Sequence, residues 1–265
     1  MPRFEPHPDR RPVLIAGASS GIGAATAEAL SELGHPVALG ARRVEQCEAL
    51  ASKIVSNGGE AFAHHLDVAD TGSVDAFVTA AETALGAAEI VVSGAGDLSF
   101  SQIHEMDPDH FLRQVDVHLV GVQRLVHRVI PGMIARQRGD FVIISSDTAG
   151  NPRPRMGAYP AAKSAVETMA QQMWMELEGT GVRASLVRPG PTMTGMGLDT
   201  TAEVIGPVLE DWSKWGFARH PEMLRAANLA SAIVAVVSAP RGAHIAVTEV
   251  QPEARVQATA AGSNR

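Results

Sequence analysis

The stretch GASSGIGAATAEAL, residues 17–30, follows a short apolar run, VLIA at 13–16, and opens an amphipathic helical pattern. Its glycines, Gly17, Gly21 and Gly23, have the spacing Gly-x-x-x-Gly-x-Gly. Glycine lets the backbone turn sharply, and the free N–H groups at a helix start bind anions. A strand, a glycine-rich turn and a helix in this order predict a dinucleotide-binding unit. A turn that uses glycine only for backbone freedom would leave the same pattern, so other signals must decide.

Short apolar runs alternate with longer helical patterns along the rest of the chain. Nearly continuous apolar strands with helices between them are typical of a parallel sheet covered on both faces. We therefore expect a single α/β domain of the Rossmann type, a doubly wound seven-stranded parallel sheet with helices on both faces. The expected strands are residues 13–16, 37–40, 61–67, 90–93, 141–145, 184–188 and 244–247.

The two ends of the chain differ in composition from the part between them. Residues 1–12 are polar and proline-rich, and we expect a flexible segment there, one domain over 13–250 and a tail over 251–265. The start lacks the pattern of a signal segment, and no apolar run approaches the roughly 20 residues that span a bilayer. Cys47 is the only cysteine, which excludes an internal disulfide and fits a reducing compartment. We expect a cytoplasmic protein.

The charge balance favours a small-molecule partner. The chain has 22 Lys and Arg against 29 Asp and Glu, a formal net charge of -7, and no basic stripe. Nucleic acid and anionic membranes are therefore not expected partners. The histidines do not have metal-ligand spacing, and we expect no metal site. The helical stretches 108–136 and 158–177 are more apolar than one buried stripe needs, which predicts a homo-oligomer, a dimer or a tetramer.

The end of the second expected strand bears on the choice of dinucleotide. It reads VALGARR at 37–43, so Ala41, Arg42 and Arg43 stand where an NAD-binding fold has an acidic residue for the ribose. A guanidinium there suits a 2′-phosphate. NADP(H) is favoured, while NAD(H) and plain solvated arginines remain the alternatives.

Tyr159 and Lys163 stand four residues apart in GAYPAAKSAV, on one face of an expected helix. An ammonium beside a phenol stabilises the phenolate and makes it a usable acid or base. Ser145 ends the fifth expected strand and Ser146 follows it, at the sheet edge where ligands bind in open α/β folds. A hydroxyl there can hold a substrate oxygen.

These motifs together resemble the short-chain dehydrogenase/reductase family, from Val13 to about Val250. The matching pieces are the glycine pattern, LDV at 66–68, GAG at 94–96, Ser146, Tyr159-x-x-x-Lys163 and RPGPTMT at 188–194. The resemblance implies an NAD(P)-dependent oxidoreductase that transfers hydride between nicotinamide and a carbonyl or secondary alcohol. The Gly-x-x-x-Gly-x-Gly spacing disfavours relatives that epimerise or dehydrate nucleotide sugars, and the three-residue gap before Lys163 disfavours enoyl reductases.

By that resemblance Tyr159 is the general acid/base, Ser146 orients the carbonyl, and Lys163 binds the nicotinamide ribose and lowers the pKa of Tyr159. Asp67 contacts the adenine, and residues 189–194 meet the nicotinamide end. The glycine pattern, the two arginines and the resemblance together give the expected cofactor-binding set: Gly17, Ser19, Ser20, Gly21, Ile22, Gly23, Arg42, Arg43, Asp67, Val68, Gly94, Ala95, Gly96, Tyr159, Lys163, Pro189, Gly190, Thr192 and Thr194.

Two positions depart from the family pattern. The family often has Asn-Asn-Ala-Gly after the fourth strand, and this chain has Ser93 in place of one amide. The fourth catalytic residue of the family, an Asn, is matched by His118 in VHLVG at 117–121. A neutral imidazole donates from one nitrogen and accepts at the other, so His118 is expected to replace the Asn in a proton relay. A hydrogen-bonded core histidine is the alternative.

Residues 193–224 occupy the position of a substrate lid and contain Trp212, Trp215 and Phe217. Their apolar character predicts a bulky apolar ketone or alcohol as substrate; packing of the lid onto the domain is the alternative. Arg153 and Arg155 could meet an acidic substrate group or lie in a solvated loop. A cofactor-binding regulator that has lost turnover is the alternative function.

Overall fold

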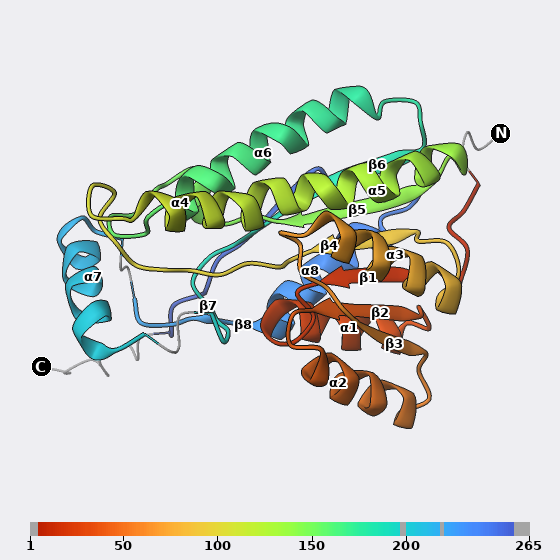
Figure 1. Cartoon of the computed structure of the whole chain (residues 1–265), viewed down its shortest axis with the longest axis horizontal. Coiled ribbons are helices and arrows are strands. Elements are labelled where there is room, and N and C mark those ends of the chain that lie inside the picture. The colour runs from red at the N-terminus through yellow and green to blue at the C-terminus, as the bar shows by residue number, and fades with distance from the viewer. Residues whose placement is uncertain (1–4, 197–199, 218–219, 257–265) are drawn as a thin grey trace, which may run out of the picture.

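The computed structural model describes residues 5–196, 200–217 and 220–256 (Figure 1). Residues 1–4 of the expected N-terminal segment, 197–199 and 218–219 of the expected lid, and 257–265 of the expected tail lie outside the described residues. Among the described helices, none is long and apolar enough to cross a membrane.

A seven-stranded parallel sheet forms the centre, with strand order β3-β2-β1-β4-β5-β6-β9. The predicted doubly wound sheet is therefore confirmed. Its strands are β1 (Val13–Ala16), β2 (Val37–Ala41), β3 (Ala61–His65), β4 (Ile90–Ser93), β5 (Gly139–Ile144), β6 (Val182–Pro189) and β9 (Val247–Val250). The order reverses direction between β1 and β4, which is where ligands bind in open α/β sheets.

Three helices cover each face of this sheet. One face carries α3 (Thr71–Leu85), α5 (Gly121–Ala135) and α6 (Tyr159–Glu176), and the other carries α1 (Gly21–Glu32), α2 (Val44–Ser56) and α8 (Ala226–Ser238). Strand residues alternate between the two cores: Leu14 and Ala16 pack in the first, and Val13 and Ile15 in the second. Figure 1 shows α5 and α6 side by side above the sheet.

The last strand begins three residues later than the sequence predicts, at Val247 instead of His244. The apolar run HIAV ends before the ladder, because the Leu186 N–H first bonds the Ala246 carbonyl (2.8 Å) and the paired register starts at Leu186 and Val247. β9 is an edge strand with a half-exposed burial pattern, so its sequence VTEV is more polar than that of a central strand.

The long helical stretch before β5 is not one uniform helix. It consists of α4 (Pro108–Val115), the π-helical segment η1 (Asp116–Val120) and α5. The Gly121 N–H donates to the Asp116 carbonyl, a bond five residues long that defines the π turn. The wider turn is where the sequence carries His118.

A second small sheet joins the segment after β6 to the part before α8. It pairs β7 (Thr192–Met193) with β8 (Leu224–Arg225) and was not predicted. Between these strands lies α7 (Ala202–Lys214), which stands apart from the central sheet at the left end of the molecule (Figure 1). This helix therefore lies outside the two helical layers that cover the sheet.

Candidate active site

The glycine-rich turn closes tightly between β1 and α1. Gly17 and Gly21 have φ angles of +88° and +58°, which favour glycine. A Cβ on Gly23 would collide with the Gly17 carbonyl oxygen. Gly21, Ile22 and Gly23 form the first turn of α1, whose leading N–H groups have no partner within the helix. The turn is built as an anion-binding helix start.

Two other predicted cofactor segments meet this turn. A Cβ on Gly17 would lie 2.7 Å from the Ala95 nitrogen, so the loop after β4 packs against the turn. A Cβ on Gly21 would lie 3.2 Å from the Thr194 Cβ, which places the segment after β6 beside the start of α1. Within that segment Thr192 Oγ1 donates to the Gly190 carbonyl (2.8 Å). The structure thus brings together predicted residues that follow β1, β4 and β6.

Arg43 lies over the glycine-rich turn. Its guanidinium donates to Ser19 Oγ (3.1 Å) and Ser20 Oγ (3.3 Å), and the side chain is exposed. Arg42 is also exposed, and its charge acts on Asp97. Arg43 therefore contacts the turn, and β2 ends at Ala41 without an acidic residue.

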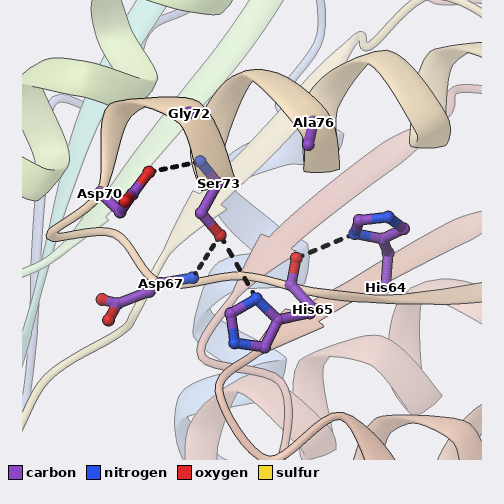
Figure 2. Close-up of a pocket in the computed structure, with 7 residues that line it drawn as sticks. All are labelled: His64, His65, Asp67, Asp70, Gly72, Ser73 and Ala76. Atoms are coloured by element: carbon purple, nitrogen blue, oxygen red, sulfur yellow. Dashed lines mark hydrogen bonds between the residues drawn. The ribbon is translucent and has the colours of Figure 1, made fainter.

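Hydrogen bonds fix the turn that carries Asp67 and Val68 after β3. The Asp67 N–H donates to Ser73 Oγ (2.9 Å), the Ala69 N–H donates to Asp67 Oδ1 (3.0 Å), and Asp70 caps α3 by accepting from the Ser73 N–H (2.7 Å). Figure 2 shows the Asp67 carboxylate turned away from Ser73 and the His65 ring. The turn holds this carboxylate at the end of the sheet.

A shallow hollow of about 480 Å³ lies beside this turn. It borders the predicted adenine residue Asp67, and neither Ser146 nor Tyr159 lines it, so it is separate from the predicted catalytic groups. Its lining residues are His64, His65, Asp67, Asp70, Gly72, Ser73 and Ala76 (Figure 2).

Ser146, Tyr159 and Lys163 converge at the carboxyl end of β5. Ser146 follows β5 and caps the short helix η2 (Asp147–Ala149), accepting from Thr148 N (3.2 Å) and Thr148 Oγ1 (2.9 Å). Tyr159 opens α6 and hydrogen-bonds with the Ser146 side chain. The Lys163 ammonium lies 5.6 Å from the centre of the Tyr159 ring. The three side chains that the sequence singled out form one buried cluster.

Burial controls the protonation of Tyr159. It raises the pKa of the phenol to about 12, while the hydrogen bond with Ser146 lowers it. The charge of Asp147 raises the pKa further, and that of Arg153 lowers it. The phenol is therefore protonated at neutral pH and able to donate a proton.

Lys163 is buried and donates from Nζ to the Ile144 carbonyl (2.7 Å). Burial lowers the pKa of this ammonium to about 8, and the Glu167 carboxylate acts in the opposite direction. An ammonium has three donors, so the bond to Ile144 anchors the side chain and leaves donors for other acceptors.

Glu167, which the sequence did not predict as a site residue, lies next to the cluster of Ser146, Tyr159 and Lys163. It is buried, accepts from Ser145 Oγ (2.7 Å), and forms a bidentate pair with Arg188 at 2.8 and 2.6 Å. One helical turn separates Glu167 from Lys163, and this spacing on a buried face was the available signal. The network joins α6 to β5 and β6.

His118 lies in the π turn with its side chain fully buried. Its Nε2 lies 2.7 Å from the Asp97 carbonyl oxygen and 3.3 Å from the Asp97 nitrogen, and its ring meets Tyr159 edge to face. A Cβ on Gly96 would lie 2.5 Å from the His118 Cε1, so the imidazole packs directly on the predicted cofactor loop. Asp97, which follows that loop, is a second residue that motif reasoning missed.

The expected lid contacts the loop that precedes Tyr159. Trp212 Nε1 donates to the Pro154 carbonyl (2.9 Å), and Arg155 pairs with Asp211 at 2.5 Å. The Arg153 guanidinium lies 5.2 Å from the centre of the Trp212 ring. Arg153 also pairs with Asp147 at 2.5 Å, so neither arginine lies in a plain solvated loop. Leu198, another apolar lid residue, lies outside the described residues.

Other reactive groups lie elsewhere. Cys47 is buried, and burial raises the pKa of its thiol to about 11, which makes it a poor nucleophile at neutral pH. Within residues 5–196, 200–217 and 220–256, no group of three His, Cys, Asp or Glu side chains is arranged to hold a metal ion.

Comparison with known proteins shows similarity to short-chain dehydrogenases. The family model described as short chain dehydrogenase matches residues 11–204. The chain is 36% identical over 243 residues to the glycine betaine reductase ATRR of Emericella nidulans, covering 91% of this chain but 18% of that protein. It is 30% identical over 248 residues to a short chain dehydrogenase of Pseudocercospora fijiensis, covering 90% and 79% of the two chains. A 2,3-dihydro-2,3-dihydroxybenzoate dehydrogenase of Bacillus subtilis is 31% identical over 182 residues, or 69% and 70% of the chains.

Solved structures show the same fold. A metagenomic short-chain oxidoreductase in complex with NADP has a TM-score of 0.77 and 28% identity, covering 92% of this chain and 98% of that one. An alcohol dehydrogenase from the archaeon Thermococcus sibiricus, in complex with 5-hydroxy-NADP, has a TM-score of 0.78 and 26% identity, covering 92% and 100%.

Proposed function

The chain belongs to the short-chain dehydrogenase family, and on this premise we propose that it is an NADP-dependent oxidoreductase acting on a carbonyl or a secondary alcohol. The observation that carries the proposal is the convergence of Ser146, Tyr159 and Lys163 beside the glycine-rich turn and its packed loops. Nicotinamide, when bound, supplies or accepts the hydride. The residues of the chain hold the reacting oxygen and move its proton.

Each catalytic group has a distinct task in this proposal. The Ser146 hydroxyl, held at the end of β5, orients the carbonyl oxygen. The Tyr159 phenol, protonated because burial raises its pKa to about 12, gives its proton to that oxygen in reduction and takes one back in oxidation. Lys163, anchored on Ile144, keeps a positive charge beside the phenol, which favours the phenolate formed during turnover.

The cofactor residues fit a dinucleotide with a 2′-phosphate. Glycines at positions 17, 21 and 23 allow the tight turn that leads into the start of α1, whose free N–H groups suit a pyrophosphate. Arg43 supplies positive charge beside Ser19 and Ser20, and Arg42 is exposed next to it. The NADP bound in similar oxidoreductases supports this preference.

The substrate of this proposal is a bulky apolar ketone or alcohol. Phe100 and Trp212 meet edge to face at 6.3 Å. Met193 and Met196 are exposed and flank Thr194 and Gly195, which lie beside Gly21 and Ser20. In this proposal residues 193–224 form the substrate lid and contribute Met193, Met196 and Trp212 to its apolar side.

Replacing Tyr159 with Phe tests the reaction. NADPH oxidation with a panel of ketones and NADP⁺ reduction with the matching alcohols are measured for both proteins, together with NADPH affinity. The variant should lose turnover by at least about 100-fold and keep its affinity for NADPH, because only the phenolic hydroxyl is removed. Turnover at the wild-type rate would refute the role of Tyr159. Faster turnover of small polar sugars than of bulky ketones would refute the substrate class.

A regulator without turnover is the less favoured alternative. A cofactor sensor has no use for a phenol hydrogen-bonded with a serine and set beside an ammonium, and this chain keeps all three groups together. The ketone panel also decides this point, since a sensor would bind NADPH without consuming it.

We also propose that copies of the chain associate through the layer of α4, α5 and α6. Leu112, Ile134 and Met175 are exposed on these helices, with exposed fractions of 62%, 39% and 74%. Large apolar side chains on one layer are typical of homo-oligomer interfaces. Sedimentation as a monomer at working concentration would contradict this.

A further inference from the structure

Thr148 makes two hydrogen bonds to the side chain of Ser146. The Thr148 N–H donates to Ser146 Oγ at 3.2 Å, and the Thr148 hydroxyl donates to the same oxygen at 2.9 Å. Ser146 caps the short helix η2 and Thr148 lies within it, and only 6% and 1% of the two residues are exposed. A buried threonine is therefore fixed on the hydroxyl that the proposed reaction uses.

The surroundings of Thr148 determine the direction of the bond between the two hydroxyls. Within the described residues, the Thr148 hydroxyl has no acceptor other than Ser146 Oγ. A buried donor without an acceptor is unfavourable, and it would result if Ser146 donated to Thr148 instead. Ser146 is therefore the acceptor in both bonds.

These two bonds leave Ser146 as a donor only. A serine hydroxyl has two lone pairs and one proton, and Thr148 occupies both lone pairs. The proton can go to Asp147 Oδ1, at 3.4 Å, or to the phenol oxygen of Tyr159. The bond to Asp147 is longer than an ordinary O–H···O bond, and this carboxylate already pairs with Arg153 at 2.5 Å. The Ser146 proton is thus directed toward Tyr159.

We propose that Thr148 is a positioning residue that fills the lone pairs of Ser146, so that the serine donates to the reacting oxygen and does not accept the Tyr159 proton. The inference rests on the proposed function, because the direction of the Ser146 proton matters only if Ser146 and Tyr159 act on one substrate oxygen. Thr148 acts on that oxygen only through Ser146. The sequence motif contains Ser146 but not Thr148.

This orientation serves both directions of the reaction. In reduction Tyr159 gives its proton to the carbonyl oxygen, and a free lone pair on Ser146 would compete for that proton. In oxidation the phenolate of Tyr159 takes the proton of the alcohol, and a hydrogen bond donated by Ser146 stabilises this phenolate. A donating Ser146 lowers the pKa of Tyr159, whereas an accepting Ser146 would raise it.

The other groups that act on Tyr159 do not depend on the Thr148 hydroxyl. Burial has the largest effect and raises the pKa of the phenol, as does Asp147, whereas Arg153 lowers it. The titratable and charged side chains that face Tyr159 are Asp147 on η2, Arg153 on the following loop, Lys163 on α6 and His118 in η1. All of them remain when Thr148 is replaced, so a change in the pKa of Tyr159 would report on Ser146.

The test compares Thr148→Val and Thr148→Ala, which lack the hydroxyl, with Thr148→Ser, which keeps it. Thr180→Val is the matched control. The Thr180 hydroxyl also makes two hydrogen bonds, to the Leu177 carbonyl (2.7 Å) and from the Val182 N–H (3.2 Å), but it lies before β6, at the opposite end of the sheet. Steady-state kcat and KM are measured in both directions, with the pH dependence of kcat for oxidation, NADPH affinity and thermal unfolding.

Loss of the hydroxyl should lower kcat about 3- to 10-fold, the value of one hydrogen bond, and leave NADPH affinity unchanged. The rise of kcat for oxidation with pH should move about 0.5–1 unit higher, because Ser146 then accepts from the phenol. Thr148→Ser and Thr180→Val should keep the wild-type kcat and pH profile. Added to Ser146→Ala, Thr148→Val should change kcat no further, because Thr148 acts only through Ser146.

An unshifted pH profile in Thr148→Val and Thr148→Ala, with or without a loss of kcat, would overturn the inference. A loss of kcat in Thr148→Ser as large as that in Thr148→Val would also overturn it, as would an equal loss on the Ser146→Ala background. If Thr148→Val unfolds, Thr148→Ala decides, because its smaller side chain needs no extra space.

Failure of the proposed function gives a different result, because Tyr159→Phe would then keep turnover. If Tyr159→Phe is inactive while both hydroxyl-free variants of Thr148 match the wild type, only the role of Thr148 is refuted.

Discussion

The rings of His118 and Tyr159 meet edge to face, with their centroids 5.0 Å apart and their planes at 88°. This contact joins the π turn to the first residue of α6. An amide has a separate donor and acceptor for the Asp97 carbonyl and N–H, whereas His118 presents one nitrogen, Nε2, to both. The imidazole therefore contacts the backbone of Asp97 through Nε2, and Nδ1 has no hydrogen-bond partner within the described residues.

The buried state of His118 should make folding stability depend on pH. Its pKa is lowered in the folded protein from the usual 6.5, so the unfolded chain takes up a proton that the folded chain refuses. The stabilisation is complete above pH 6.5 and is lost as the pH falls below it, by up to about 1.4 kcal/mol per pH unit for one proton. Urea unfolding between pH 7.5 and 5 should show a smaller decline in His118→Asn than in the wild type.

The control for this measurement comes from the protein itself. Burial also lowers the pKa of His7 and of His35, and both remain in the variant, so some decline in acid should persist. Equal slopes for wild type and variant would show that His118 is not the group that refuses the proton.

Arg43 should determine the preference for NADPH over NADH. Its guanidinium already reaches Ser19 and Ser20 at the glycine-rich turn, where the charge would meet a 2′-phosphate. Arg43→Leu should weaken NADPH binding about 10- to 100-fold, the value of one or two charged hydrogen bonds, and leave NADH binding nearly unchanged. Titration of both cofactors against wild type and variant measures this. An equal loss for NADPH and NADH would mean that Arg43 only supports the turn.

Gly23 should tolerate no side chain, in contrast to Gly206 on α7. A Cβ at 23 would collide with the Gly17 carbonyl oxygen, so Gly23→Ala should open the turn, weaken NADPH binding and lower the melting temperature. Nothing lies within 4 Å of a Cβ at 206, and Ala is about 0.5–1 kcal/mol better than Gly within a helix. Gly206→Ala should therefore leave the melting temperature unchanged or raise it. Thermal unfolding with and without NADPH compares the two, and a Gly23→Ala protein with normal affinity would contradict the tight turn.

The sheet could be predicted because each strand is a short apolar run buried on both faces, such as VLIA and IVVS. The sequence predicts the last strand at HIAV, residues 244–247, because this run is more apolar than VTEV, residues 247–250. VTEV forms the strand because an edge strand needs fewer apolar residues. The π turn at 116–120 left no signal in composition, since the apolar spacing continues through it. Short strands of two residues, such as β7 and β8, are set by tertiary contacts and not by local pattern.

Buried ion pairs are the feature of the fold that the sequence pattern predicts least well. Arg11, which precedes β1, is 3% exposed and lies between the carboxylates of Glu89 and Asp140. Arg183, in β6, also pairs with Asp140. A sequence pattern treats isolated charges as surface residues, because burial of a charge requires a partner that only the fold supplies. The partners here are far apart in sequence and meet at the edge of the sheet opposite the active site.

Some residues of the candidate site could be predicted from the sequence and others could not. Ser146, Tyr159 and Lys163 stand in a motif with fixed spacing, so their convergence was predictable. Asp97 and Glu167 have no motif, and their roles depend on distances across the fold: 3.3 Å from Asp97 Oδ1 to His118, and 2.7 Å from Glu167 to Ser145. Residues that support a catalytic group through another side chain are visible only once the chain is folded.

The hydrogen bond between Trp212 and Pro154 should hold α7 against the loop that leads to Tyr159. Trp212→Phe keeps an aromatic ring near Arg153, but removes the N–H that donates to Pro154 at 2.9 Å together with part of the indole ring. A hydrogen bond contributes about 0.5–1.5 kcal/mol, so KM for a bulky ketone should rise about 2- to 10-fold while kcat changes little. Trp215→Phe is the matched control, because Trp215 is 67% exposed at the end of the same helix and should leave KM unchanged. If α7 is no lid, both variants will have the KM of the wild type; if the helix is needed only for folding, Trp212→Phe will lower the melting temperature with KM intact.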